Sequence, residues 1–176
     1  MKSNYTIDPA HSSAGFVVRH MMITNVRGGF TKVQGTVAYD PENPAATEID
    51  ATIDAASINT TDPQRDAHLR SAEFLDAEKY PAITFKSKST KKTGDDELSI
   101  TGDLTIHGVS KEVTLKVEGI TGHNKDPWGN LRMGASASTK IKRSDFGLTY
   151  NAALETGGFL IGDDLKIELE VSLVKA

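Results

Sequence analysis

Residues 97–118 read ELSITGDLTIHGVSKEVTLKVE, and apolar and polar side chains alternate along most of this stretch. An alternation of period two places one set of side chains on each face of a β-strand. From Glu97 to His107 one face is apolar, and the pattern resumes from Val113 to Glu118 after a turn at Gly108–Lys111. The two segments therefore predict an antiparallel hairpin with one buried face and one face in water.

The same alternation recurs on both sides of this hairpin. In Leu131–Lys142 the inward residues are mostly small, which leaves room behind the strand, and Leu165–Leu173 shows the cleanest alternation in the chain. Shorter or rougher strands are predicted at 14–18, 26–40, 49–53 and 83–85, which brings the total to roughly eight. The long strand at 26–40 contains Gly28, Gly29 and Gly35, which predict bends or bulges.

One segment breaks the strand pattern. Asp62–Ser71 begins with an N-cap acid and a proline at the first helical position, followed by good helix formers, and predicts a short helix. A second helical turn is predicted at Ala72–Ala77. Because strands and helices do not alternate elsewhere, a parallel α/β sheet is excluded.

Many long antiparallel strands must hide their edges, either by stacking as a sandwich or by closing as a barrel. Strands of about 10 residues span about 33 Å and are long for a sandwich. We therefore predict an all-β fold, an antiparallel up-and-down barrel of about eight strands with one or two short helices. The 176 residues, with no repeat or linker, predict one domain over 1–176.

The composition excludes several classes of function. The net charge is −4 with no long run of either sign, which argues against a nucleic-acid partner. No cysteine is present, so thiol catalysis and thiolate metal sites are absent. The five histidines show no metal-ligand spacing and no glycine-rich phosphate loop occurs, so we expect neither a metal nor a cofactor.

The N-terminal residues Met1–Asp8 lack the apolar stretch of a signal peptide. The chain as written is therefore expected in the cytoplasm, and an export signal removed beforehand would instead place it in the periplasm or outside the cell. No segment approaches the roughly 20 apolar residues that cross a bilayer, so no stable membrane insertion is expected.

The predicted helix carries the only cluster with possible chemistry. Arg65 and His68 lie three residues apart on one side, and Asp66 can pair with Arg70 four residues on. The cluster could serve a hydrolase or isomerase through Arg65, Asp66 and His68, but no nucleophile motif accompanies it. We favour a plug or lid held by salt bridges, with contact to a ligand head group as a third reading.

Several motifs taken in order resemble a known family. They are Tyr5–Ser12, Phe16–His20, Val26–Phe30, Arg65–Ser71 with Phe74, Tyr80–Phe85, Gly102–Lys111, Trp128-Gly129 and Arg143–Gly147. The chain resembles the YceI-like family of bacterial lipid-binding proteins over nearly its whole length. The resemblance implies a lipocalin-like barrel, often a homodimer and often exported, that encloses polyisoprenoids or similar amphiphiles and has no established catalytic activity.

We therefore expect a non-enzymatic protein that carries or sequesters a long-chain apolar ligand, such as a polyisoprenoid, a prenyl quinone or a fatty-acid-like amphiphile. A structural dimer with a filled core is the other reading besides the enzyme. The candidate ligand-binding residues are Phe16, Val18, Phe30, Arg65, His68, Phe74, Phe85, Leu104, Met133, Phe146 and Phe159.

Overall fold

Strands dominate residues 1–155 and 158–176, which the computed structural model describes. In these residues the chain forms twelve strands, one α-helix and four short 3₁₀ helices. The strands are β1 (Ser3–Ile7), β2 (Ser13–His20), β3 (Thr24–Phe30), β4 (Val33–Tyr39), β5 (Glu48–Asp54), β6 (Ile58–Asn59), β7 (Ala82–Gly94), β8 (Glu97–Ile106), β9 (Val109–Glu118), β10 (Asn124–Lys125), β11 (Leu131–Lys142) and β12 (Ile161–Lys175). The helices are η1 (Pro9–His11), η2 (Pro44–Ala46), η3 (Ala55–Ser57), α1 (Pro63–Arg70) and η4 (Arg143–Phe146).

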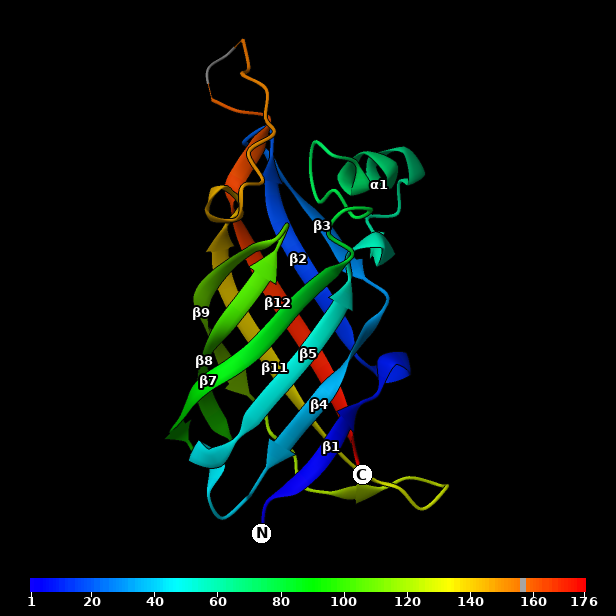
Figure 1. The fold of residues 1–176 in the computed structure, drawn as a ribbon, viewed down its shortest axis with the longest axis vertical. Helices are drawn as coiled ribbons and strands as arrows, with labels where there is room; N and C mark the ends of the chain where they lie inside the picture. Colours follow the sequence, from blue (N-terminus) through cyan, green and yellow to red (C-terminus); the bar gives the residue numbers. More distant parts are fainter. Residues whose placement is uncertain (156–157) are drawn as a thin grey trace.

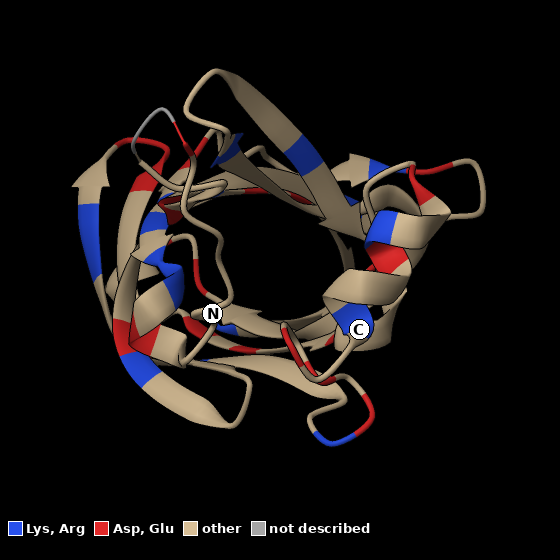
Figure 2. Ribbon diagram, turned by 90° about the horizontal axis from the view of Figure 1, so that it is seen from above, with Lys and Arg blue, Asp and Glu red and all other residues tan. Residues whose placement is uncertain are grey.

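Eight of the strands close into a ring. The order is β1-β4-β5-β7-β8-β9-β11-β12, and β12 pairs with β1 to complete it, with Tyr5 opposite Lys175. The seam between β11 and β12 runs from Arg132↔Val174 to Lys142↔Asp164, and every pairing in the ring is antiparallel. Seen from above, the wall strands surround a central space (Figure 2). The predicted antiparallel barrel is confirmed.

The predicted single strand at 26–40 is wrong, because the chain divides there into β3 and β4. β4 pairs with β1 and β5 in the ring, whereas β3 pairs with β2 and β6, which are not among the eight strands of the ring. The predicted strand at 14–18 lies within β2, which η1 separates from β1. β2 and β3 form an antiparallel hairpin that extends the sheet towards one end of the barrel (Figure 1).

The turn between β8 and β9 is shorter than predicted. It consists of His107 and Gly108, which both have positive φ (54° and 71°), and β9 already begins at Val109. Two successive positive φ angles are typical of the type I′ turn, whose twist matches that of the flanking strands. Residues 109–111 therefore belong to the strand and not to the turn.

Helix α1 forms where the sequence predicts it. The Asp62 carboxylate accepts hydrogen bonds from the backbone N–H groups of Gln64 and Arg65 at 3.1 and 3.2 Å. The second helical turn predicted at 72–77 is wrong, since the chain there forms irregular turns that bury Phe74 and Leu75. Packing of these side chains on the barrel overrides the local helix preference.

The two ends of the barrel differ in what covers them. Helix α1 lies beside one end, which we call the α1 end, together with the β2–β3 hairpin (Figure 1). Both chain termini lie at the opposite end, which we call the terminus end.

Candidate functional site: the barrel cavity

The barrel encloses a cavity of about 550 Å³ that is lined by side chains from all eight wall strands. The lining follows the alternation of the sequence, as on β12, where Leu165, Ile167, Leu169, Val171 and Leu173 face inward. In the middle of β11 the lining consists of the small side chains Ala135, Ala137 and Thr139. Small side chains on one wall leave the interior open instead of filled, so the reading of a filled core is wrong.

Nine of the candidate ligand-binding residues line this cavity. They are Phe16, Val18, Phe30, Arg65, His68, Phe74, Phe85, Leu104 and Met133. They come from β2, β3, α1, the segment after α1, β7, β8 and β11, so segments far apart in the chain meet around one space.

Phe146 and Phe159 do not line the cavity. Phe146 is only 1% exposed and packs in the cluster that contains Ile106, Ile141 and Leu148. Phe159 is 60% exposed and lies in an isolated bridge with Ala153. Neither residue lies in a strand with period-two alternation, so the sequence offered no rule for which way the ring points.

The charged side chains that line the cavity are all arginines, namely Arg19, Arg65 and Arg143, and all three lie at the α1 end. His20 and His68 line the same end. No Asp, Glu or Lys contributes to the lining in the part of the chain that the structure describes. The cavity is therefore apolar along its length and basic at one end.

Sequence reasoning missed Arg143, which is 6% exposed. Its guanidinium donates to the carbonyls of Gly162 and Leu148, both at 2.8 Å, and to those of Tyr150 and Ile161 at 3.2 and 3.3 Å. Burial lowers the pKa of Arg143. The only available signal was its place in the Arg143–Gly147 motif of the family, because a lone arginine at a strand end is usually solvated.

Arg65 and Asp66 both bind Thr60. The Arg65 guanidinium donates to the hydroxyl and to the carbonyl of Thr60, each at 2.8 Å. The Asp66 carboxylate accepts from the hydroxyl and the N–H of Thr60 at 2.5 and 2.8 Å, and the hydroxyl bond holds the pKa of Asp66 below its ordinary value. The predicted Asp66–Arg70 pair is absent, since Arg70 donates to the carbonyls of Ala56 and Ile58 instead.

His68 lies apart from this cluster. Its Nε2 contacts Glu73, and its ring packs edge-on against Phe74 and Tyr150, with centroids 4.9 and 5.0 Å away. Asp66 faces Thr60 while His68 faces Glu73, so the candidate catalytic residues do not converge on one point. These contacts fasten α1 and a cluster of three aromatic rings to the rim of the cavity.

The terminus end is closed by a buried tyrosine. Tyr5 is 1% exposed, its hydroxyl forms a 2.7 Å hydrogen bond with His123 Nε2, and the two rings stack at 5.8 Å. Burial raises the pKa of the Tyr5 hydroxyl. Tyr5 packs in a core cluster with Ile7, Met133 and Leu173, which also line the cavity.

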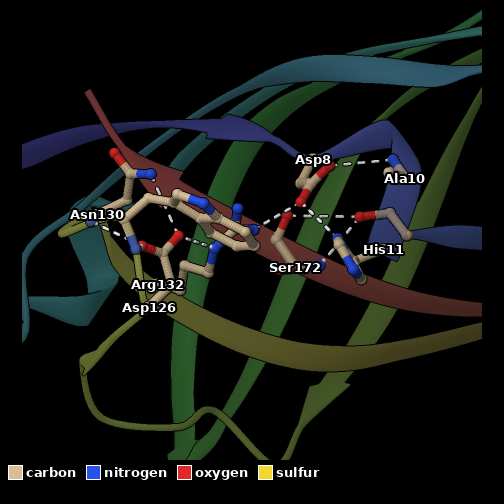
Figure 3. A network of polar contacts seen from close by, with 9 residues as sticks. Asp8, Ala10, His11, Asp126, Asn130, Arg132 and Ser172 are labelled. Atoms are coloured by element: carbon tan, nitrogen blue, oxygen red, sulfur yellow. Dashed lines mark hydrogen bonds and ion pairs between the residues drawn. The ribbon is translucent and has the colours of Figure 1, made fainter.

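Beside this tyrosine an arginine forms hydrogen bonds with two carboxylates at the surface. Arg132 donates to Asp8 at 2.5 Å and to Asp126 at 2.7 Å, and His11 bonds the Asp8 carboxylate at 2.8 Å (Figure 3). Hydrogen bonds from Arg132 lower the pKa of both Asp8 and Asp126 to about 2. The network links η1 to the segment that joins β10 and β11.

Neither a cluster of metal ligands nor a bilayer-spanning helix occurs in the described residues. No three His, Asp or Glu side chains in them are grouped so as to hold a metal ion. Among the helices in the described part of the chain, none combines the length and the apolar composition that a bilayer span requires.

Comparison with known proteins gives consistent results. A family profile for the YceI-like domain matches residues 5–173. Protein YceI of Escherichia coli O17:K52:H18 is 45% identical over 148 residues, which cover 83% of this chain and 76% of that protein. Among solved structures, Burkholderia cenocepacia BcnA has a TM-score of 0.82 at 26% identity, covering 94% of this chain and 98% of BcnA. A polyisoprenoid binding domain from Saccharophagus degradans has a TM-score of 0.71 at 18% identity, covers 98% of each chain, and shows the fold alone. The chain therefore belongs to the YceI-like family.

Proposed function

We propose that the protein binds a long-chain apolar ligand inside the barrel and carries or sequesters it. A polyisoprenoid, a prenyl quinone or a fatty-acid-like amphiphile fits the proposal. The observation that carries it is the apolar cavity of about 550 Å³, which lies in the range of roughly 300–1,000 Å³ typical of small-molecule sites. The name of the Saccharophagus degradans domain supports the choice of polyisoprenoids within this class.

The distribution of charge suggests how the ligand lies. Tyr5 closes the terminus end with apolar neighbours, whereas Arg19, Arg65 and Arg143 line the α1 end. An apolar tail is therefore expected to extend towards Tyr5, and a polar or anionic head group is expected near the arginines, because a charged head must be paired or solvated.

The tail should dominate the affinity. Each buried CH₂ group contributes about 0.8 kcal/mol, so a five-carbon prenyl unit contributes roughly 4 kcal/mol before ordering costs. A charge-assisted hydrogen bond to the head adds only about 1.5–3 kcal/mol. We expect tail length to decide selectivity and head-group identity to matter less.

Extraction and titration test the proposal. Protein purified without detergent should release a co-purified lipid into organic solvent, where mass spectrometry detects it, and delipidated protein should bind a prenyl quinone or prenyl phosphate at micromolar concentration. Protein that is free of lipid and binds neither probe would overturn the proposal.

A matched pair of variants on β11 places the ligand. Ala137→Trp puts a large ring into the cavity and should weaken binding by at least about tenfold, which corresponds to about 1.4 kcal/mol. Ser138→Trp, one residue along and on the outer face, should bind as the parent protein does. Equal affinities of the two variants would place the ligand outside the barrel.

The expected homodimer and the transport role stay predictions. Light scattering coupled to size-exclusion chromatography, with and without bound lipid, measures the first. Transfer of a fluorescent prenyl probe between two vesicle populations measures the second.

A further inference from the structure

The turn between β2 and β3 exposes three large apolar side chains in succession. Met21, Met22 and Ile23 are 43%, 63% and 68% exposed. Phe159, from the segment before β12, is 60% exposed. We call these four residues the apolar tip. Exposed large apolar residues that gather at one place are typical of an interaction surface.

The backbone of this turn is unfavourable for the residues that it carries. Met21 and Met22 have φ of 51° and 59°, and Ile23 N–H donates to the His20 carbonyl at 3.1 Å, which closes a turn of the I′ type. Asn-Gly is the usual sequence of such a turn, because side chains disfavour positive φ. The chain instead places two methionines there, and strain of this kind at an exposed position indicates a role for the side chains.

The apolar tip is one surface at the rim of the cavity. Met21 N–H donates to the Leu160 carbonyl at 2.6 Å, so the β2–β3 turn and the segment with Phe159 lie side by side. His20, Leu160 and Ile161, which adjoin the tip residues in the chain, all line the cavity. A ligand that enters or leaves at the α1 end therefore passes beside the apolar tip.

The charges of the hairpin favour an anionic partner. Ser13–Phe30 contains Arg19, His20 and Arg27 and no acidic residue, although the whole chain has a net charge of −4. Arg19 donates to Asn25 Oδ1 and to the Met22 carbonyl, directly beneath the tip, and it forms no ion pair in the described part of the chain. The acids nearest to Phe159 along the chain are Glu155 and Asp163, and the Asp163 carboxylate accepts hydrogen bonds from the N–H and the hydroxyl of Ser144.

We propose that the apolar tip docks the α1 end of the barrel on the surface of an anionic lipid bilayer. Methionine, isoleucine and phenylalanine side chains enter the interfacial region while the arginines behind them meet acidic head groups, as in other interfacial segments. A long-chain ligand then moves between bilayer and cavity without exposing its tail to water. This inference rests on the proposed function, because it assigns the source from which the ligand comes.

The decisive variant improves the turn while it removes the apolar surface. Met21→Asn, Met22→Gly and Ile23→Thr together give the Asn-Gly sequence that the turn geometry favours, so the triple variant should fold at least as well as the parent. Trp128→Ser is the matched control, because Trp128 is 79% exposed but lies in the loop after β10 at the terminus end.

Flotation with vesicles measures docking. The parent protein and Trp128→Ser should float with vesicles of equal parts phosphatidylcholine and phosphatidylglycerol, less with phosphatidylcholine alone, and less as salt is added. The triple variant should lose at least about tenfold in vesicle affinity. Absence of flotation by the parent protein, or flotation of the triple variant as strong as that of the parent, overturns the inference.

Delivery of the ligand separates this inference from the proposed function. A prenyl quinone added from ethanol should bind the triple variant as tightly as the parent, whereas uptake from vesicles should be slower in the variant only. Loss of binding by both routes in the parent protein would refute the proposed function itself. A change in oligomeric state of the triple variant with unchanged vesicle affinity would assign the apolar tip to a second copy of the chain and overturn bilayer docking.

Discussion

Each end of the barrel contains an arginine with several hydrogen bonds, but the two arginines have different kinds of acceptor. At the terminus end Arg132 bonds two carboxylates, Asp8 and Asp126, beside the buried Tyr5. At the α1 end Arg143 donates to four backbone carbonyls, two in the irregular segment after η4 and two at the start of β12, and has no carboxylate within ion-pair distance in the described residues. Arg132 therefore joins side chains at the surface, whereas Arg143 joins the backbone of the irregular segment after η4 to the backbone at the start of β12.

This difference indicates that the two ends have different roles, with the terminus end stabilising the fold and the α1 end admitting the ligand. At the terminus end Tyr5 is buried and Arg132 bonds two carboxylates. The two ends of the chain pair there through β1 and β12. The α1 end combines positive φ angles at Met21 and Met22, exposed apolar side chains and the basic part of the cavity lining. Elements that admit a ligand are expected to come from the less stable part of a structure. Four predictions test whether this difference in roles holds.

The largest effect is expected at the closed end. Tyr5→Ala removes a side chain that is 1% exposed and should lower the free energy of unfolding by roughly 3–5 kcal/mol, because the cavity left behind cannot collapse fully. Tyr5→Phe keeps the ring, loses the bond to His123 and should lose only about 0.5–1.5 kcal/mol. Urea denaturation measures both variants. If Tyr5→Ala lowered the free energy of unfolding by less than Tyr5→Phe does, the terminus end would not anchor the fold.

Arg143→Ala should destabilise by about 3 kcal/mol. Leaving one buried polar group without its partner costs roughly 1–3 kcal/mol, and here several carbonyls lose their donor while water reaches some of them. Arg143→Lys should recover little, because an ammonium group cannot reproduce the planar set of donors. Denaturation curves decide this, and full recovery by lysine would mean that the charge matters and the geometry does not.

Substitutions in the turn at the apolar tip should raise the free energy of unfolding instead of lowering it. Met21→Asn with Met22→Gly relieves two unfavourable φ angles and should raise the free energy of unfolding by roughly 1 kcal/mol. Thermal denaturation measures this, with Trp128→Asn as a control, because Trp128 is 79% exposed in the loop after β10 at the other end. A destabilised double variant would show that the methionines stabilise the hairpin and are not strained.

The last prediction concerns Arg132→Gln, which removes the donor that Asp8 and Asp126 share and should lower the free energy of unfolding at neutral pH. The folded-state pKa of Asp8 and Asp126 is about 2, below the unfolded value of about 3.9. The contribution of both groups to stability is therefore present above about pH 4 and is lost as the pH falls towards 2. Arg132→Gln should flatten this acid dependence in urea denaturation between neutral pH and pH 2. Arg27→Gln, an exposed arginine at the α1 end, should leave it unchanged, and an acid limb that is equally steep in both variants would contradict the assignment.

Much of the barrel could be predicted because strand alternation is a local property. Period two assigned the inward faces of β8, β11 and β12 correctly, and the Asp62 cap and Pro63 located the start of α1. Nine of the eleven candidate ligand-binding residues line the cavity. Each of these signals is contained within a few neighbouring residues.

The predictions failed where no such local signal exists. Phe146 and Phe159 lie outside regular strands, so only the packing around them decides that one is buried in a core cluster and the other exposed. The strand predicted at 26–40 divides because β3 and β4 have different partners, which the residues of that segment do not reveal.

The sequence by itself therefore determined which residues face inward along the long strands β8, β11 and β12, where the helix begins and that the chain is all-β, because these follow from backbone geometry over short distances. Only the tertiary structure decided that the barrel closes through β12 and β1, that Tyr5 meets His123, and that Met21 lies beside Leu160 at the rim of an open cavity. These contacts join residues more than a hundred positions apart, and they depend on how all the strands pair at once, not on any one of them.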